Sequence, residues 1–282
     1  MFKKISFILI ILFSNSIIFK LSATEYLYSG ARSLGLANTN VTLYDIWSTN
    51  NNQAGLAYVQ DFGLGFSYEN RFGLSELGVK NLNLALPVKW GTFGLTVQQF
   101  GYSNYSENKF GLAYGMKLSK RISMGIQLDY LLVSVAETQT PNKSAITAEI
   151  GIQAQLTDKL KLGAHYYNLP NANLSGDFNE QIPSVLRIGL NYEFSKKVFT
   201  VLDVEKNMDL PTLIKMGVEY HPIDALYFRG GIDLNTNINN EVKFAAGLGV
   251  KLKGFNLDLA FNHQTYIGYI SQISLSYSIS KK

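Results

Sequence analysis

The residues that could carry chemistry are few in this 282-residue chain, and they lie far apart in sequence. Histidine occurs three times, as His165, His221 and His263, and cysteine is absent. A serine hydrolase site needs a base held against its nucleophile, and zinc or calcium sites need ligands at characteristic spacings. Serine is abundant, but no spacing in the sequence points to such a base or to a metal site. We therefore expect no enzymatic activity, no metal and no cofactor.

Charged residues occur instead at single positions within otherwise alternating segments. Gly and Ala share these alternate positions with them. Charges of both signs among small residues are typical of a confined polar interior, where they either pair with one another or select a solute. Mutual pairing is the interpretation that we favour. The nine charged candidates for this interior are Asp129, Glu149, Arg187, Asp203, Lys215, Glu219, Arg229, Lys243 and Asp258.

The segments that carry these charges alternate with a period of two from Phe62 onward. Ile122, Met124, Ile126 and Leu128 form one apolar stripe, and similar stripes recur to the end of the chain. A period of two marks strands with two different faces. The pattern predicts about 14 strands of roughly ten residues, which is the length that a tilted strand needs to cross a bilayer.

Tight turns and longer polar loops alternate between these strands. Residues 119–120, 195–197 and 253–254 predict tight turns after even-numbered strands, whereas 69–77 and 101–108 predict longer loops after odd-numbered ones. Short turns at one end and long loops at the other are typical of outer-membrane barrels. An even number of strands would place both chain termini at the short-turn, periplasmic end.

A soluble β-sandwich is the alternative, because alternation alone does not say which face meets lipid. Its second face would carry Thr, Lys and Glu for contact with water, but here that face is rich in Gly and Ala. Aromatic residues gather at the expected short-turn ends, as at a membrane interface. They are Phe62, Trp90, Phe93, Phe194, Tyr220 and Phe255. The predicted fold class is therefore an all-β transmembrane antiparallel barrel that spans residues 61–282.

The first 23 residues have the pattern of a secretory signal peptide. Lys3 and Lys4 precede an apolar run from 5 to 19, and Ala23 supplies a small residue for cleavage. The alternative is an N-terminal anchor helix, for which the run is short and interrupted by Ser and Asn. Residues 1–23 hold three lysines and no acid, so 22 basic and 21 acidic residues remain, a net charge of +1. This balance gives no reason to expect nucleic-acid binding.

Residues 24–60 do not alternate, and they contain two motifs. The first comprises Gly30, Ala31, Arg32 and Gly35, and the second runs Asn52, Gln53, Ala54, Gly55 and Leu56. Both resemble the opening of FadL-like barrels, including the PorV/PorQ branch tied to type IX secretion, although Gln53 stands where that family usually has Pro. The resemblance implies a 14-stranded barrel whose N-terminal segment folds in the lumen as a hatch. A polar segment can hydrogen-bond to lumen charges, whereas lipid cannot; a disordered periplasmic leader is the alternative.

Two functions remain open at this point. The resemblance implies an accessory or interaction protein of the PorV/PorQ type, which binds secretion-machinery proteins or exported cargo. The alternative is a FadL-like channel for passive uptake of hydrophobic small molecules, which should have an apolar track in its lumen. Lumen positions are mostly Gly, Ala and charges, with exceptions such as Leu131 and Val133, which agrees with the first function. The resemblance, and not the residue chemistry, is the reason that we favour it. Either protein would lie in the outer membrane of a Gram-negative cell, in contact with its lipids and lipopolysaccharide.

Overall fold

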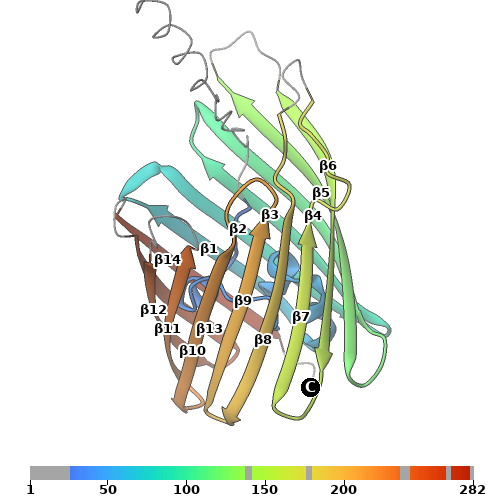
Figure 1. Ribbon diagram of the computed structural model, residues 1–282, viewed down its shortest axis with the longest axis vertical. Coiled ribbons are helices and arrows are strands. Elements are labelled where there is room, and N and C mark those ends of the chain that lie inside the picture. Colours follow the sequence, from blue (N-terminus) through green and yellow to red (C-terminus); the bar gives the residue numbers. More distant parts are fainter. Residues whose placement is uncertain (1–25, 137–141, 176–179, 236–241, 265–267, 280–282) are drawn as a thin grey trace, which may run out of the picture.

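The computed structural model describes residues 26–136, 142–175, 180–235, 242–264 and 268–279. Fourteen antiparallel strands in these ranges follow one another around a closed barrel (Figure 1). The predicted fold class is confirmed. The strands are β1 Phe62–Arg71, β2 Leu74–Val88, β3 Gly91–Gly101, β4 Tyr105–Lys117, β5 Ile122–Val135, β6 Lys143–Gln155, β7 Leu160–Tyr167, β8 Val185–Ser195, β9 Val198–Asn207, β10 Leu213–Ile223, β11 Leu226–Asn235, β12 Val242–Leu252, β13 Phe255–Gln264 and β14 Gly268–Ile279.

The first and last strands close the barrel. Residue pairs join β1 to β14 without interruption from Phe62–Ile279 to Arg71–Ile270. An open edge would leave backbone N–H and C=O groups without partners in lipid, and each such group costs several kcal/mol. The polypeptide can therefore cross a bilayer only as a complete cylinder.

The two faces of each strand have opposite character. On β5, the side chains of Ile126 and Leu128 are 52% and 61% exposed on the outside, whereas the intervening Gln127 and the following Asp129 are 1% and 2% exposed. A water-soluble protein has the reverse arrangement. The apolar outside is suited to acyl chains, and the polar residues are enclosed. In the described ranges, no helix is both long and apolar enough to cross a membrane.

One end of the barrel, called here the short-turn end, carries the predicted tight turns. The exposed aromatic residues Trp90, Phe93, Phe194, Tyr220 and Phe255 lie near this end, as an interfacial belt requires. The connections there are residues 89–90, 118–121, 156–159, 196–197, 224–225 and 253–254.

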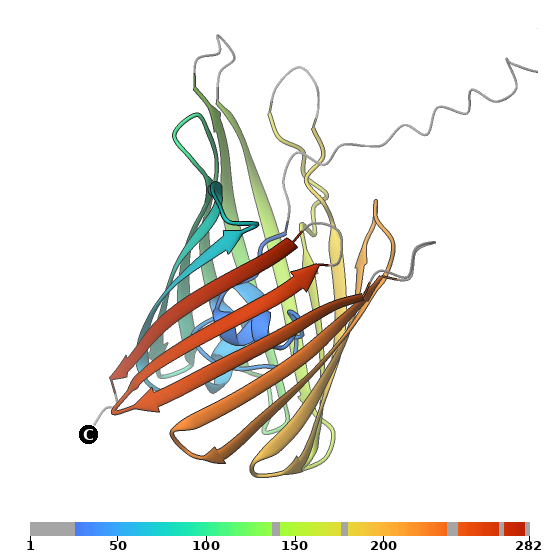
Figure 2. The same cartoon turned by 90° about the vertical axis from the view of Figure 1, so that its left-hand side faces the viewer.

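At the opposite end, called here the loop end, two of the predicted loops are wrong. Only Phe72 and Gly73 join β1 to β2, in place of a loop over 69–77, and only 102–104 join β3 to β4. Phe72 and Gly73 have φ of 58° and 73°, as a two-residue type I′ turn requires. Backbone pairing needs no apolar face, so polar residues can prolong the strands, and β5 and β6 extend far at this end (Figure 2). The connection 168–184 between β7 and β8 stays long.

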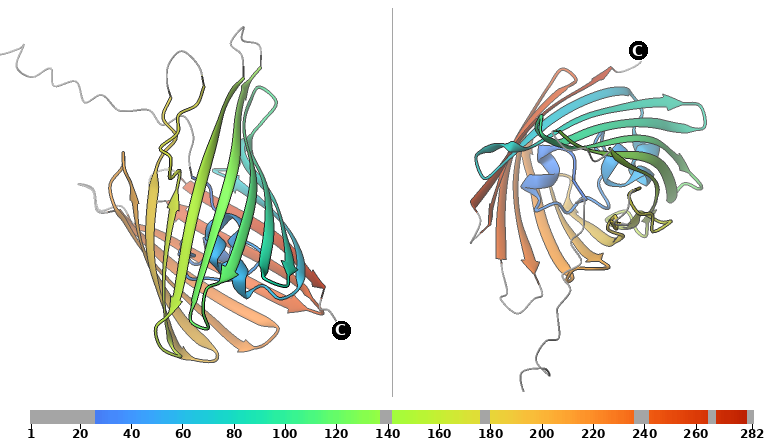
Figure 3. Two further views of the ribbon diagram at one scale, coloured as in Figure 1. Left: turned by 90° about the vertical axis from the view of Figure 1, so that its right-hand side faces the viewer. Right: turned by 90° about the horizontal axis from the view of Figure 1, so that it is seen from above.

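The hatch segment lies inside the ring of strands (Figure 3). It forms two short helices, α2 (Ala31–Gly35) and α3 (Ser48–Asn51), and the 3₁₀ helix η1 (Gln53–Tyr58). Most of its residues are buried, including polar ones such as Asn50. The segment therefore fills the lumen with groups that can meet the polar inner face of the strands.

The two ends of the described chain lie at opposite ends of the lumen. Tyr26 packs against Leu131 and Val133, which lie near the loop end of β5. By contrast, β14 ends at Ile279, opposite Phe62 at the short-turn end. The end of β14 therefore lies at the short-turn end, as expected for the C-terminus. The first described residues lie near the loop end instead, because the hatch extends along the lumen between the two ends. The predicted signal peptide, residues 1–23, lies outside the described residues.

Replacing Leu128 with Arg tests whether the outer face meets lipid. A charge in the middle of this face should lower the free energy of unfolding by about 2–4 kcal/mol, whereas one near the interface costs about 0–1 kcal/mol. Leu118→Arg, in an exposed short turn, is the matched control. Guanidinium unfolding in lipid vesicles, followed by tryptophan fluorescence, measures both. Equal effects of the two substitutions would contradict the assignment.

Candidate functional site

Close contacts shape the hatch locally. Gly30 precedes α2 with a φ of 87°, and a Cβ at this position would lie 2.6 Å from the Trp47 ring. Asn52 precedes η1, accepts a hydrogen bond from the Ala54 backbone N–H at 3.1 Å and donates one to the Val41 carbonyl at 2.6 Å. These positions therefore define the path of the hatch backbone inside the barrel.

The remaining motif residues pack the hatch against its surroundings. Ala31, Gly35, Ala54, Gly55 and Leu56 are all buried. Because four of the five are Gly or Ala, the hatch backbone can approach the strands closely. The motif residues thus serve the packing of a plug.

Three of the predicted lumen charges meet in a central cluster with Lys109 and His165. The Glu149 carboxylate lies 2.8 Å from both Lys109 Nζ and His165 Nε2, and Asp129 lies 3.8 Å from the same Lys109 Nζ. Arg187 Nη2 lies 2.8 Å from His165 Nδ1. A guanidinium only donates, so Nδ1 accepts from Arg187 and Nε2 donates to Glu149. Buried charges are tolerable only when paired in this way.

The hatch completes this central cluster. Arg187 donates hydrogen bonds to the Asn40 side chain at 2.6 Å and to the Tyr26 hydroxyl at 2.8 Å, and it also donates to the Asn51 carbonyl. Gln53 Nε2 donates to Glu149 at 2.8 Å. Proline, which is usual in the resembled family at this position, has no side-chain donor. The departure from the family motif therefore adds a bond between the hatch and the barrel wall.

A second cluster contains the predicted charges Glu219, Arg229 and Asp258. Arg32 of α2 donates to Glu219 through Nε at 2.8 Å and Nη2 at 2.9 Å, and it binds Asp45 at 3.0 Å. Arg229 binds Glu219 and Asp258, each at 2.6 Å. Burial acts to lower the pKa of Arg32, but Glu219 and Asp45 raise it above its ordinary value. The bidentate pair therefore stays charged and fastens α2 to β10.

The other three predicted charges lie apart from these clusters. Asp203 accepts hydrogen bonds from the backbone N–H groups of Asn40 at 2.8 Å and Val41 at 3.1 Å. Lys215 pairs with Glu205 at 2.8 Å. Lys243 lines a polar cavity toward the loop end. The nine charges therefore fall into two clusters and three separate positions.

Several contributors were absent from the sequence-based candidates. Lys109 and Glu205 occupy lumen positions of β4 and β9, next to the outward Phe110 and Val204, so alternation alone could have identified them. Gln53 lies in the hatch, where no periodicity exists to predict a partner. Its role becomes visible only in three dimensions.

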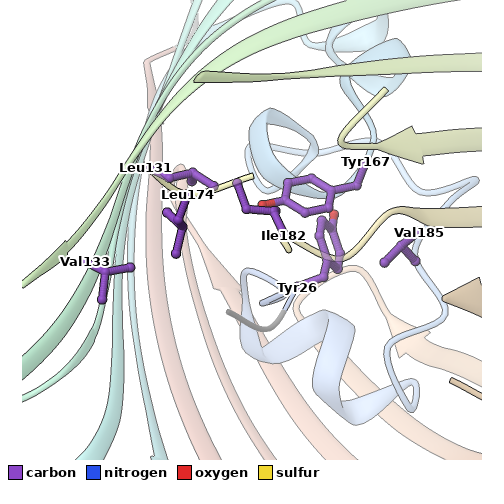
Figure 4. Packing of buried hydrophobic residues seen from close by; sticks show 7 residues of the cluster. All are labelled: Tyr26, Leu131, Val133, Tyr167, Leu174, Ile182 and Val185. Carbon is purple, nitrogen blue, oxygen red and sulfur yellow. The ribbon is translucent and has the colours of Figure 1, made fainter. Parts of the chain in front are cut away.

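A cluster of buried apolar side chains, called here the apolar pocket together with the small cavity next to it, lies beside the central cluster and toward the loop end (Figure 4). Tyr26 from the hatch and Tyr167 from β7 pack there with ring centroids 4.9 Å apart. The cavity measures about 30 Å³, and Tyr26, Leu131, Val133 and Tyr167 are among the residues that line it. The buried residues of the cluster are Tyr26, Leu131, Val133, Tyr167, Leu174, Ile182 and Val185.

Comparison with known proteins identifies the fold. No protein-family model matches the chain, and no curated protein matches it in sequence. The Pseudomonas putida toluene transporter TodX matches its structure with a TM-score of 0.71 and 13% identity, over 90% of this chain and 99% of that one. The Ralstonia pickettii toluene transporter TbuX gives 0.69 and 12% over 91% and 100%, and a Pseudomonas aeruginosa FadL homologue gives 0.63 and 10% over 90% and 99%.

These neighbours have in common the fold of the FadL-like barrels. The chain has the same fold as these FadL-like barrels. At identities of 10–13% the likeness concerns the fold. The PorV/PorQ resemblance gains no support from these comparisons and stays a prediction.

Replacing Arg187 with Met tests the hold of the central cluster on the hatch. Loss of one partner from a buried charged cluster costs about 3–5 kcal/mol, because the remaining groups are left uncompensated. We expect faster hydrogen exchange of residues 26–60, measured by mass spectrometry in detergent. Arg121→Met, in an exposed short turn, should leave the exchange unchanged. Equal protection in the two variants would show that Arg187 does not hold the hatch.

Proposed function

We propose that this protein is an outer-membrane channel for passive uptake of small hydrophobic molecules. The observation that carries the proposal is the apolar pocket at the loop end of the lumen, next to the central charged cluster. Leu131 and Val133 point inward from β5, where the neighbouring lumen positions are polar. A barrel that needed only ion pairs to fill its interior has no use for apolar side chains there.

The charges next to the pocket favour a neutral ligand over a carboxylate. Lys109 borders the pocket, with its ammonium 5.5 Å from the Tyr167 ring centroid. Its charge is already met by Glu149 at 2.8 Å and Asp129 at 3.8 Å. A carboxylate would have to compete with two buried acids for this cation, whereas a hydrocarbon would need only apolar contact.

Entry of such a ligand requires the hatch to yield. The cavity of about 30 Å³ admits little more than a water-sized group. Tyr26 is the hatch residue within the pocket, and its hydroxyl is held by Arg187 at 2.8 Å and donates to the Asn50 carbonyl at 2.9 Å. Displacement of the Tyr26 ring would enlarge the pocket without disturbing the strands.

The comparisons support the same proposal. Proteins described as toluene transporters share this fold over nearly their entire length. We place the protein in the outer membrane of a Gram-negative cell, with the short-turn end toward the periplasm, following the rule for such barrels. Lipids and lipopolysaccharide would then surround its apolar outside.

The type IX secretion role is tested against this proposal in a deletion strain. Uptake of toluene from the medium should be slower without the protein, and the secreted proteome should be unchanged. Normal uptake together with a secretion defect would refute the channel and favour the PorV/PorQ hypothesis.

Substitution of Val133 tests the pocket directly. Val133→Asn places an amide against the ligand path and should slow toluene uptake into proteoliposomes about tenfold, which corresponds to ~1.4 kcal/mol of lost apolar interaction. Val135→Asn is the matched control, since Val135 shares the strand and the parity of Val133 but is 41% exposed beyond the pocket. Equal rates for the two variants would exclude the pocket from the route.

A further inference from the structure

Two cavities lined by both polar and apolar residues lie on opposite sides of the hatch, mainly along strands β9 to β14, with further residues from β1 and β8 in one and from β7 and β8 in the other. The loop-end cavity measures about 530 Å³, and Leu34 and Asn38 form its hatch side. The turn-end cavity measures about 450 Å³, and Arg32 and Leu43 form its hatch side. Since residues 32 and 34 border different cavities, the partition between them is about as thin as one turn of helix.

Along the strands, the residues that line the two cavities are separated by a small residue. On β10, Lys215 borders the loop-end cavity and Glu219 the turn-end cavity, and Gly217 lies between them. On β11, Asp233 and Arg229 flank Gly231 in the same way. On β13, Ala260 separates Asn262 from Asp258. At the level of the partition, the wall is therefore a band of small residues between two polar layers, defined as Gly217, Gly231, Ala245, Gly247 and Ala260.

The partition consists of the segment 31–37 seated on this band. A Cβ on Gly247 would lie 3.1 Å from Gly35 Cα, and a Cβ on Gly231 would lie 2.6 Å from the Leu36 carbonyl carbon. On the side of the turn-end cavity, the bidentate ion pair between Arg32 and Glu219 holds the segment to β10. The segment is thus held by close backbone packing, by this bidentate pair, by the hydrogen bond from the Ala31 N–H to Ser274 Oγ, and by the packing of Leu34 against Ala260 and Ile270.

Both cavities offer polar groups to a solute. Asn262 lines the loop-end cavity and Asn191 the turn-end cavity, and their buried side-chain oxygens accept no hydrogen bond within the described residues. Three acidic and three basic residues line the loop-end cavity, and four acidic and five basic residues line the turn-end cavity. Such balanced charge favours neutral or zwitterionic solutes over ions of either sign.

We propose that residues 31–37 are a gate, and that when they lift from the small-residue band the two cavities join into a passage for small polar solutes. This passage follows β10 to β13, whereas the apolar pocket lies beside β5 and β7, and Tyr26 and Val185 border both the pocket and the loop-end cavity. The protein would then have two adjoining routes, one for hydrocarbons and one for water-soluble molecules.

The experiment compares Gly247→Val with Gly230→Val. A valine side chain at position 247 would push Gly35 away from the small-residue band, whereas a Cβ at position 230 meets no atom within 4 Å. In planar bilayers with KCl, Gly247→Val should raise the open probability about tenfold, equal to ~1.4 kcal/mol of lost packing, with a reversal potential near zero in a salt gradient. Gly230→Val should match the wild type. Liposomes that contain Gly247→Val should also swell faster in a pentose solution.

A disulfide provides the reverse test in the same variant. The Ala31 backbone nitrogen lies 3.2 Å from Ser274 Oγ, so the two residues are neighbours. The natural sequence contains no cysteine that could compete for an introduced disulfide. Ala31→Cys with Ser274→Cys, added to Gly247→Val, should return the conductance to the wild-type level when oxidised and restore the leak when reduced. Heat-modifiable mobility on gels checks that each barrel is folded.

Two results would overturn the gate. One is a folded Gly247→Val protein whose conductance equals that of Gly230→Val; the other is a leak that persists after the disulfide forms. Toluene uptake by Gly247→Val should stay at the wild-type rate. Absence of toluene uptake from the wild type itself would refute the proposed function and leave the gate standing.

Discussion

Lipid cannot form hydrogen bonds, and this constraint accounts for the whole arrangement. It closes the sheet, because an open edge would leave backbone groups without partners. It also favours an inward position for charged residues such as Asp129, Glu149 and Arg187, which are buried. The charges must therefore find partners among themselves or in the hatch, as Arg187 does with Asn40 and Tyr26. The hatch is thus part of the solution to the same constraint, since it brings polar groups to charges that the wall alone leaves exposed.

The interior divides into two regions of different chemistry. Around β4 to β8, buried charges form a connected cluster, and an apolar pocket opens beside it toward the loop end. Around β9 to β14, the wall alternates between polar layers and small residues, and two cavities flank the hatch. One region therefore suits apolar contact and the other suits solvated polar groups. The hatch contacts both, through Tyr26 in the first region and Arg32 in the second.

The apolar lumen residues Leu131 and Val133 have a role in the structure that the sequence does not reveal. Leu131 and Val133 look like minor exceptions along a list of Gly, Ala and charges, which agrees with a secretion role. In three dimensions they meet Tyr26 and Tyr167 with residues of the 168–184 connection, and together these residues form one pocket. The pocket arises because β5, β7 and the hatch come together only in the closed barrel.

The sequence by itself determined the barrel. The two-residue period, the roughly ten-residue segments and the tight turns follow from local rules of strand geometry, and β5 with its outward Leu128 and inward Asp129 shows them directly. It also determined which face of each strand a charge would occupy. The same alternation therefore assigns Lys109 and Glu205 to the lumen face. Only the tertiary structure decided the partners: that Gln53 reaches Glu149, that Arg32 reaches Glu219, and that Tyr26 lies at the loop end. The physical reason is that parity is a property of consecutive residues, whereas these contacts join an aperiodic segment to strands about 100 to 190 residues away, across a space that exists only once the barrel has closed.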